Sequence, residues 1–188
     1  MKIAVFGKMR SGKNTVADIL THEHYFKQFA FGDGIGEIIE KYFPEDWVGG
    51  KPRKHYQHIG QQLRVLNPDV WINYLLRTVE KYGEDCRFLR QCPNNIVVTD
   101  GRQLNEAKRL KEEGFLIVKV TAPEELRIKR MEASGDVYSP ELLSHETELQ
   151  VDLIEGDIEI INDGTLEELM VKVQKMIQGG VQDGEIKY

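Results

Sequence analysis

Short apolar runs alternate with stretches of helical spacing along the whole chain. Five runs of four to seven residues are typical of buried parallel strands, and they lie at 3–6, 25–31, 96–99, 115–120 and 158–161. The stretches between the runs predict the helices that carry the chain back to the same edge of the sheet. The pattern therefore predicts one three-layer α/β domain, in which helices cover both faces of a five-stranded parallel sheet.

The first run ends in a glycine-containing turn, and a helical stretch follows that turn. Residues 7–13 read Gly-Lys-Met-Arg-Ser-Gly-Lys and fit the first seven positions of the phosphate-binding pattern G-x-x-x-x-G-K-[ST]. In this pattern backbone N–H groups wrap a phosphate, and the lysine, here Lys13, reaches the β- and γ-phosphates. Asn14 stands where Ser or Thr usually binds Mg²⁺, so Thr15 becomes the candidate ligand, directly or through water. The sequence thus predicts a P-loop that binds nucleotide phosphates.

Polar residues follow the predicted strands at the edge where open parallel sheets bind their ligands. Asp33 follows the second strand, and Asp100 ends the third with Arg102 close behind. Asp100 could orient Mg²⁺ through water or accept a hydrogen bond from the acceptor, and Asp33 could contact the acceptor's hydroxyl or base. Asn162 follows the fifth strand, where a turn explains it as well as a binding role does.

Arg127 and Arg130 are three residues apart on a predicted helix that precedes a polar loop. This spacing places both side chains on one face, which suits a mobile lid over about 127–148 that brings positive charge to the transferring phosphoryl group. A solvated basic face is the alternative. Arg64 follows a basic loop and is a candidate to clamp the acceptor phosphate, with an ordinary surface position as its alternative.

Over nearly its whole length the chain resembles the deoxynucleoside monophosphate kinases of phage type. The resemblance rests on the P-loop at 7–15, on Phe-Gly-Asp at 31–33 and on Asn-Pro-Asp-Val-Trp-Ile-Asn at 67–73. It continues in Thr-Asp-Gly-Arg at 99–102, where the family usually has Asp-Val-Arg. The closing run Ile-Asn-Asp-Gly-Thr-Leu at 161–166 is similar to that of dephospho-coenzyme A kinases.

This resemblance implies a P-loop NTPase fold of the nucleoside-monophosphate-kinase type. One kinase domain would span 1–178, with a helical acceptor-binding insertion at about 33–82 and the lid, and a polar tail would occupy 179–188. The implied activity is the transfer of the terminal phosphoryl group of ATP to a (deoxy)nucleoside monophosphate, with Mg²⁺. Gly101, in place of a bulkier residue, is expected to change the fit of the substrate without abolishing transfer.

The resemblance also implies a set of site residues. Those expected to hold ATP are Gly7, Arg10, Ser11, Gly12, Lys13, Asn14, Thr15, Asn162 and Gly164. Those expected on the acceptor side are Asp33, Arg64, Asp100 and Arg102. Those expected to act on the transferring group are Lys13, Asp100, Arg127 and Arg130.

Composition and charge argue against nucleic acids and membranes as binding partners. The formal net charge of −6 argues against a broad nucleic-acid surface, which needs clustered positive charge. The sequence has neither an apolar run of membrane-spanning length nor a signal-peptide pattern, so we expect a cytoplasmic protein without membrane or nucleic-acid partners. Cys86 and Cys92 are expected to be reduced thiols. The oligomeric state stays open, with a homodimer among the options.

Two other functions stay open at this point. A dephospho-coenzyme A kinase would share the fold and donor but would phosphorylate a sugar hydroxyl, with Asp33 as its candidate base. The Asp-Ala-Asp run usual in that family after the second strand is missing here. A non-catalytic nucleotide-binding switch would share the P-loop, but the chain has no guanine-selective Asn-Lys-x-Asp type motif. Production of ADP that depends on an acceptor separates a kinase from a switch.

Overall fold

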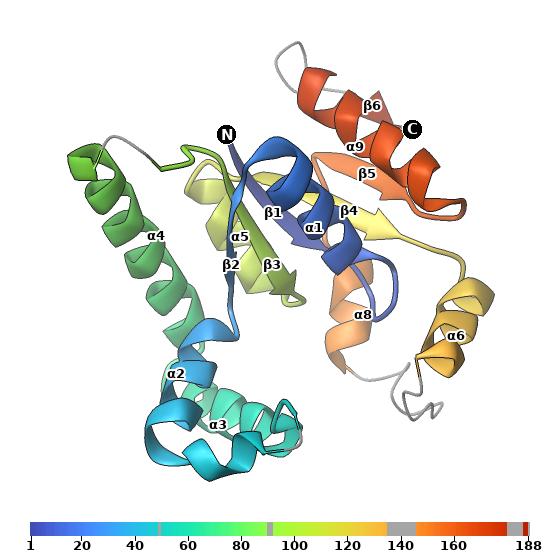
Figure 1. Ribbon diagram of the computed structural model, residues 1–188. Helices are drawn as coiled ribbons and strands as arrows, with labels where there is room; N and C mark the ends of the chain where they lie inside the picture. The colour runs from blue at the N-terminus through green and yellow to red at the C-terminus, as the bar shows by residue number, and fades with distance from the viewer. Residues whose placement is uncertain (49, 90–91, 135–145, 180–185, 188) are drawn as a thin grey trace. The chain divides into compact units, whose positions relative to one another are not determined.

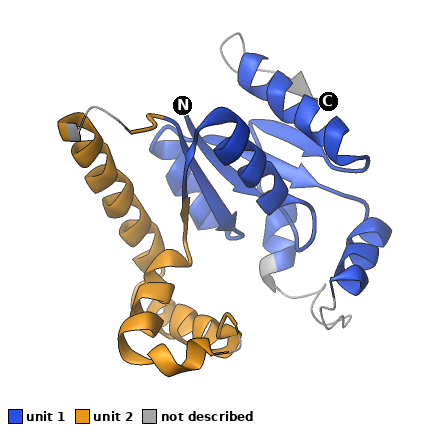
Figure 2. Ribbon diagram, in the orientation of Figure 1, with its two compact units in different colours: residues 1–28, 95–188 blue, residues 29–94 orange. Residues whose placement is uncertain are grey.

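The computed structural model describes residues 1–48, 50–89, 92–134, 146–179 and 186–187. The chain forms two compact units, one made of residues 1–28 and 95–188 and the other of residues 29–94 (Figure 2).

The first unit is built on a sheet of strand order β2-β3-β1-β4-β5-β6 (Figure 1). Its strands are β1 (Lys2–Phe6), β2 (Lys27–Ala30, which leads into the second unit), β3 (Ile96–Gly101), β4 (Leu116–Thr121), β5 (Ile158–Ile161) and β6 (Ile186–Lys187). β1 pairs in parallel with β3 and β4, and β5 pairs in parallel with β4 and β6. The first five strands confirm the predicted parallel fold, and β6 adds a short edge strand from within the predicted tail.

Five helices accompany this sheet in the described part of the first unit. They are α1 (Lys13–His24), α5 (Leu104–Glu112), α6 (Glu124–Ala133), α8 (Glu146–Asp152) and α9 (Leu166–Gly179). Helices α1 and α9 lie on one face of the sheet and α5 lies on the other (Figure 1). The apolar sides of α1 and α9 share one core with the strands, in which Leu20 and Val173 are fully buried beside Val118. The alternation of strand and helix read from the sequence is therefore real.

An irregularity in β3 shapes the carboxyl edge of the sheet. Ala4 pairs with Val98 but Phe6 pairs with Gly101, so β3 carries one residue more than β1 over this stretch. Asp100 lies in the irregular stretch and has a positive φ of 59°, which Asp tolerates better than most residues. Such irregularities often redirect a side chain next to an active site.

The second unit is helical after β2. It contains α2 (Asp33–Tyr42), the short 3₁₀ helix η1 (Pro44–Trp47), α3 (Arg53–Leu66) and α4 (Val70–Leu89). The indole Nε1 of Trp71 donates a 3.0 Å hydrogen bond to the carbonyl of Gly60 and so joins α4 to α3. Ile35, Ile39 and Leu75 complete the buried side of these helices. That the unit binds the acceptor remains a prediction.

Cys86 and Cys92 correct an expectation, because the structure joins them in a disulfide with their Cα atoms 5.1 Å apart. Two residues six apart in one continuous helix are separated by about 9 Å. Because α4 ends at Leu89, residue 92 is free of that limit and can return to Cys86. None of the helices in the described ranges is both long and apolar enough to span a membrane.

Candidate active site

The phosphate loop between β1 and α1 has the backbone that an anion cradle needs. Arg10 and Gly12 have positive φ values of 59° and 103°, and local left-handed turns of this kind aim backbone N–H groups into one concavity. A Cβ atom at Gly7 would overlap the carbonyl oxygen of Val120, and one at Gly12 would overlap the amide nitrogen of Asn162. Both glycines are therefore required by close neighbours, and the loop fits a bound phosphate.

Asn162 supports this loop from the end of β5. Its Nδ2 donates a 2.9 Å hydrogen bond to the carbonyl of Ser11, and its backbone nitrogen donates to Thr121 at 2.7 Å. The side chain is buried, so its hydrogen bond to the loop is shielded from water. Its predicted contact with ATP stays a prediction.

Gly164 has a local reason for being glycine. A Cβ atom there would overlap the carboxylate of Glu168, which accepts a 2.8 Å hydrogen bond from the backbone nitrogen of Thr165 at the start of α9. This turn accounts for Gly164 without a ligand, and its expected contact with ATP likewise stays a prediction.

Lys13 folds back onto the loop that carries it. Its Nζ donates to the carbonyls of Gly7 at 2.6 Å and Lys8 at 3.0 Å, and the residue is buried. The pKa of Lys13 is lowered to about 7, chiefly by burial and next by the positive charge of Arg102, while the negative charges of Glu148 and Asp100 act in the opposite direction. A phosphate that takes the place of the carbonyls would favour the charged form of the amine.

The two arginines of α6 both reach the phosphate loop. Arg127 is buried, and its Nη1 donates to the carbonyl of Met9 at 3.2 Å. Arg130 Nη1 donates to the carbonyl of Arg10 at 3.3 Å, and its Nη2 donates to the carbonyl of Asn162 at 3.2 Å. The structure therefore brings both to the loop, Arg127 buried and Arg130 half-buried, and their action on a transferring phosphoryl group stays a prediction. Of the lid predicted over about 127–148, residues 135–145 lie outside the described residues.

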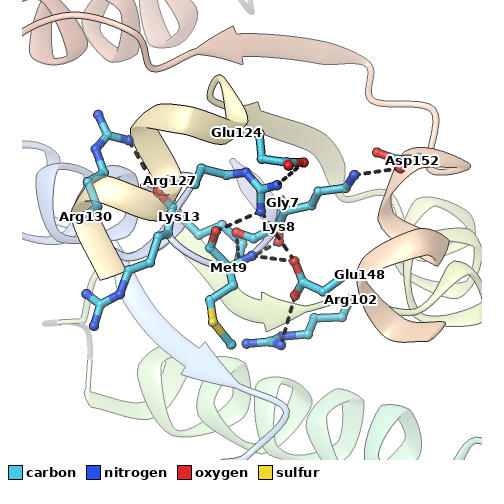
Figure 3. Close-up of polar contacts among 11 residues, drawn as sticks. Gly7, Lys8, Met9, Lys13, Arg102, Glu124, Arg127, Arg130, Glu148 and Asp152 are labelled. Atoms are coloured by element: carbon cyan, nitrogen blue, oxygen red, sulfur yellow. Dashed lines mark hydrogen bonds and ion pairs between the residues drawn. The ribbon is translucent and has the colours of Figure 1, made fainter. Parts of the chain in front are cut away.

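A buried carboxylate that sequence reasoning missed, that of Glu148 in α8, joins this cluster (Figure 3). Its Oε1 accepts from Arg102 Nη1 at 3.2 Å, and its Oε2 accepts from the backbone nitrogen of Met9 at 2.8 Å. Arg127 Nη1 lies 3.7 Å from the same Oε2. The only sequence signal is that Glu148 precedes the buried Val151 by three residues, at a position where a helix normally carries an apolar side chain.

Asp100 and Thr15 are the candidates for Mg²⁺. Asp100 is half-buried at the end of β3, and its negative charge is close enough to Lys13 to raise the pKa of the lysine. Thr15 is half-buried in the first turn of α1, and Asn14 is exposed. Carboxylate and hydroxyl oxygens suit Mg²⁺, which binds few protein ligands and keeps several waters. Among the described residues no group of three or more His, Cys, Asp or Glu could hold a metal by itself.

Asp33 and Arg64 belong to the second unit. One carboxylate oxygen of Asp33 accepts a 2.8 Å hydrogen bond from the backbone nitrogen of Ala30, which fixes the turn into α2. Arg64 lies in the last turn of α3, with its guanidinium folded back toward Gly60. Their acceptor-side roles stay predictions.

A family model described as an AAA domain (AAA_18) matches residues 3–146. The chain belongs to this P-loop family. The predicted resemblance to P-loop kinases is thereby confirmed, and so is the prediction of a kinase at the level of the enzyme class.

Individual proteins agree with the family. The chain is 24% identical over 203 residues to a protein of Acanthamoeba polyphaga mimivirus that is provisionally named a deoxynucleotide monophosphate kinase, covering 96% of this chain and 97% of that protein. The structure of TT1252 from Thermus thermophilus superposes with a TM-score of 0.54 at 19% identity over 97% of this chain and 98% of that one. Shikimate kinase from Aquifex aeolicus gives 0.52 at 17% identity over 98% and 100%. At such identities the structures establish the fold.

Proposed function

We propose that this protein transfers the terminal phosphoryl group of ATP to a (deoxy)nucleoside monophosphate and releases the diphosphate. The observation that carries the proposal is the convergence of cationic side chains on the phosphate loop. Arg127 and Arg130 donate to loop carbonyls, Lys13 folds onto the loop, and Arg102 is close enough to lower the pKa of Lys13. A loop that only held a nucleotide would have little use for three arginines.

This cluster suits transfer between two phosphates. A phosphate acceptor is already an anion, so catalysis needs positioning and charge neutralisation more than a general base. The site offers cations from three separate elements, α1, α6 and the segment after β3. The relative from mimivirus, named for deoxynucleotide monophosphates, supports an acceptor of that class.

The residues take the following roles in the proposal. Backbone N–H groups of the loop and the amine of Lys13 bind the donor phosphates, and Arg127 and Arg130 neutralise charge on the transferring group. Asp100 and Thr15 would hold Mg²⁺, which lowers the negative charge of the phosphates when it is bound. The acceptor would be held by side chains that include Asp33 and Arg64.

The test is ADP release from ATP and Mg²⁺ against a panel of acceptors. The panel holds the ribo- and deoxyribonucleoside monophosphates and dephospho-coenzyme A, with Lys13→Ala as the inactive variant. Lys129→Ala is the matched control, because Lys129 is exposed on α6 between the two arginines. We expect stimulation by one or a few monophosphates that Lys13→Ala loses and Lys129→Ala keeps. Stimulation by dephospho-coenzyme A alone, or ATP binding without any stimulation, would refute the proposal.

A further inference from the structure

Helix α8 buries an acidic residue, whereas Leu149 in the helix and Leu153 just after it are exposed. Glu148 is 1% exposed, whereas Leu149 and Leu153 are 53% and 67% exposed. A buried charge is costly unless it is paired, and leucines that stay more than half exposed gain little from folding. The contacts of Glu148 therefore help to orient this helix, together with the buried Val151.

The contacts of Glu148 form a closed ring with the phosphate loop. Its carboxylate accepts from the backbone nitrogen of Met9, Arg127 lies against the same carboxylate oxygen, and Arg127 donates to the carbonyl of Met9. The other carboxylate oxygen accepts from Arg102. Figure 3 shows the carboxylate between the two guanidinium groups. One acidic side chain thus connects two arginines, from different elements, to one residue of the loop.

The helix that carries Glu148 is itself fixed beside the loop. Lys8 Nζ lies 2.7 Å from a carboxylate oxygen of Asp152, one helical turn after Glu148 (Figure 3). Lys119 Nζ donates to the carbonyls of Asp152 at 3.1 Å and Ile154 at 3.0 Å. Lys119 satisfies carbonyls at the end of α8, and both lysines complement the negative end of the helix dipole. The carboxylate of Glu148 is therefore held by its own contacts, and the helix that carries it is held by the lysines at its C-terminal end.

We propose that Glu148 is a positioning residue, which holds Arg102 and Arg127 in place at the phosphate loop before any nucleotide arrives. Long arginine side chains lose rotamer freedom when they are ordered, and here Arg102 and Arg127 also carry like charge. A carboxylate between the arginines offsets that repulsion and orders them in advance, so that nucleotide binding need not do so. The proposal rests on the proposed kinase function and names a residue that assembles its cationic site.

The first test is steady-state kinetics of Glu148→Asp, with Glu155→Asp as the matched control because Glu155 is exposed beyond α8. Aspartate keeps the negative charge but shortens the side chain by one methylene, and displacement of this order can cost about 100-fold in rate. We expect kcat to fall by roughly 10- to 100-fold, with KM for ATP changed by less than about threefold. If Glu148 served only to supply a negative charge, Glu148→Asp would keep the kcat of the wild type. That result would overturn the proposal.

The second test does not depend on turnover. In the ligand-free protein, the Nε–Hε NMR signals of Arg102 and Arg127, assigned with Arg102→Lys and Arg127→Lys, should report restricted side chains that become mobile in Glu148→Asp and Glu148→Gln. Arginines that are already mobile in the wild type would overturn the proposal. Tighter ATP binding by Glu148→Gln would also overturn it, since Glu148 would then compete with the nucleotide. If the wild type shows no acceptor-dependent turnover, the kinase proposal fails, whereas the NMR result still decides the role of Glu148.

Discussion

The side-chain amide of Asn162 donates a 2.9 Å hydrogen bond to the main-chain carbonyl of Ser11, so the end of β5 supports the phosphate loop. The two residues are 151 positions apart in the sequence. Asn162 also accepts from Arg130, which itself donates to the loop at Arg10. The loop is thus braced by residues from the other end of the chain, and its shape does not depend on the local glycine pattern alone.

Asn162→Ala should weaken both the fold and nucleotide binding. The buried carbonyl of Ser11 loses its donor, which costs about 1–3 kcal/mol of unfolding free energy. We also expect roughly tenfold weaker ATP binding, measured by isothermal titration calorimetry beside a denaturant titration. Asp163→Ala is the control, because the adjacent Asp163 is exposed and contacts Lys172 instead of the loop. Equal effects from the two variants would contradict the bracing role.

Gly12→Ala should greatly weaken ATP binding. The added Cβ would overlap Asn162 Nδ2, and the residue has a positive φ of 103°. Gly114→Ala separates the two causes, because Gly114 also has a positive φ, 78°, but its Cβ would meet nothing within 4 Å. Gly114→Ala should cost only about 1–2 kcal/mol of backbone strain and leave ATP affinity unchanged. If Gly12→Ala binds ATP as well as Gly114→Ala does, the close packing of Asn162 on the loop is wrong.

The ring of Phe6 packs against Gly101 and leaves no room for a side chain there, because a Cβ atom at Gly101 would overlap that ring. The absence of a bulkier residue, which was expected to alter substrate fit, thus has a packing reason inside the sheet. Gly101→Val should cost about 1–3 kcal/mol by overpacking. Combining it with Phe6→Leu should recover part of that loss, a coupling measurable by denaturant unfolding of the four proteins. Strictly additive losses would show that the two residues do not compete for space.

Nucleotide binding should take up a proton through Lys13. Its pKa is lowered to about 7 by burial and by Arg102, so the amine of the empty protein is mostly neutral near pH 8 and mostly charged near pH 6. Bound phosphates raise this pKa, so binding near pH 8 takes up close to one proton and binding near pH 6 takes up far less. Calorimetry in two buffers of different ionisation enthalpy measures the uptake, with Lys13→Met subtracted to remove the ATP contribution. Equal uptake at the two pH values after subtraction would contradict the lowered pKa.

The fold could be predicted from the sequence because its main signals are local. The strands β1, β3, β4 and β5 lie in apolar runs, and the phosphate loop follows from glycine spacing between a strand and a helix. The positions of Arg127 and Arg130 on one helix also follow from spacing. Each of these features is written within a few consecutive residues.

The features that escaped prediction depend on contacts between distant residues. Glu148 lies 139 positions from Met9, and its spacing from Val151 is only a weak local sign that it is buried. Leu149 in α8 and Leu153 just after it are exposed, so the leucines do not mark the buried side of the helix. Strand β6 has two residues, too few for a periodic signal, and the Cys86–Cys92 disulfide depends on where α4 ends.

The proposed reaction places the γ-phosphoryl group of ATP on the phosphate of the acceptor. The most direct measurement follows γ-³²P-labelled ATP with the monophosphate that best stimulates ADP release, and separates the nucleotide products by anion exchange. We predict label in the β-position of the acceptor's diphosphate, formed in equal amount with ADP and absent with Lys13→Ala. Label that appears only as inorganic phosphate, or on a hydroxyl of the acceptor, would contradict phosphoryl transfer between phosphates.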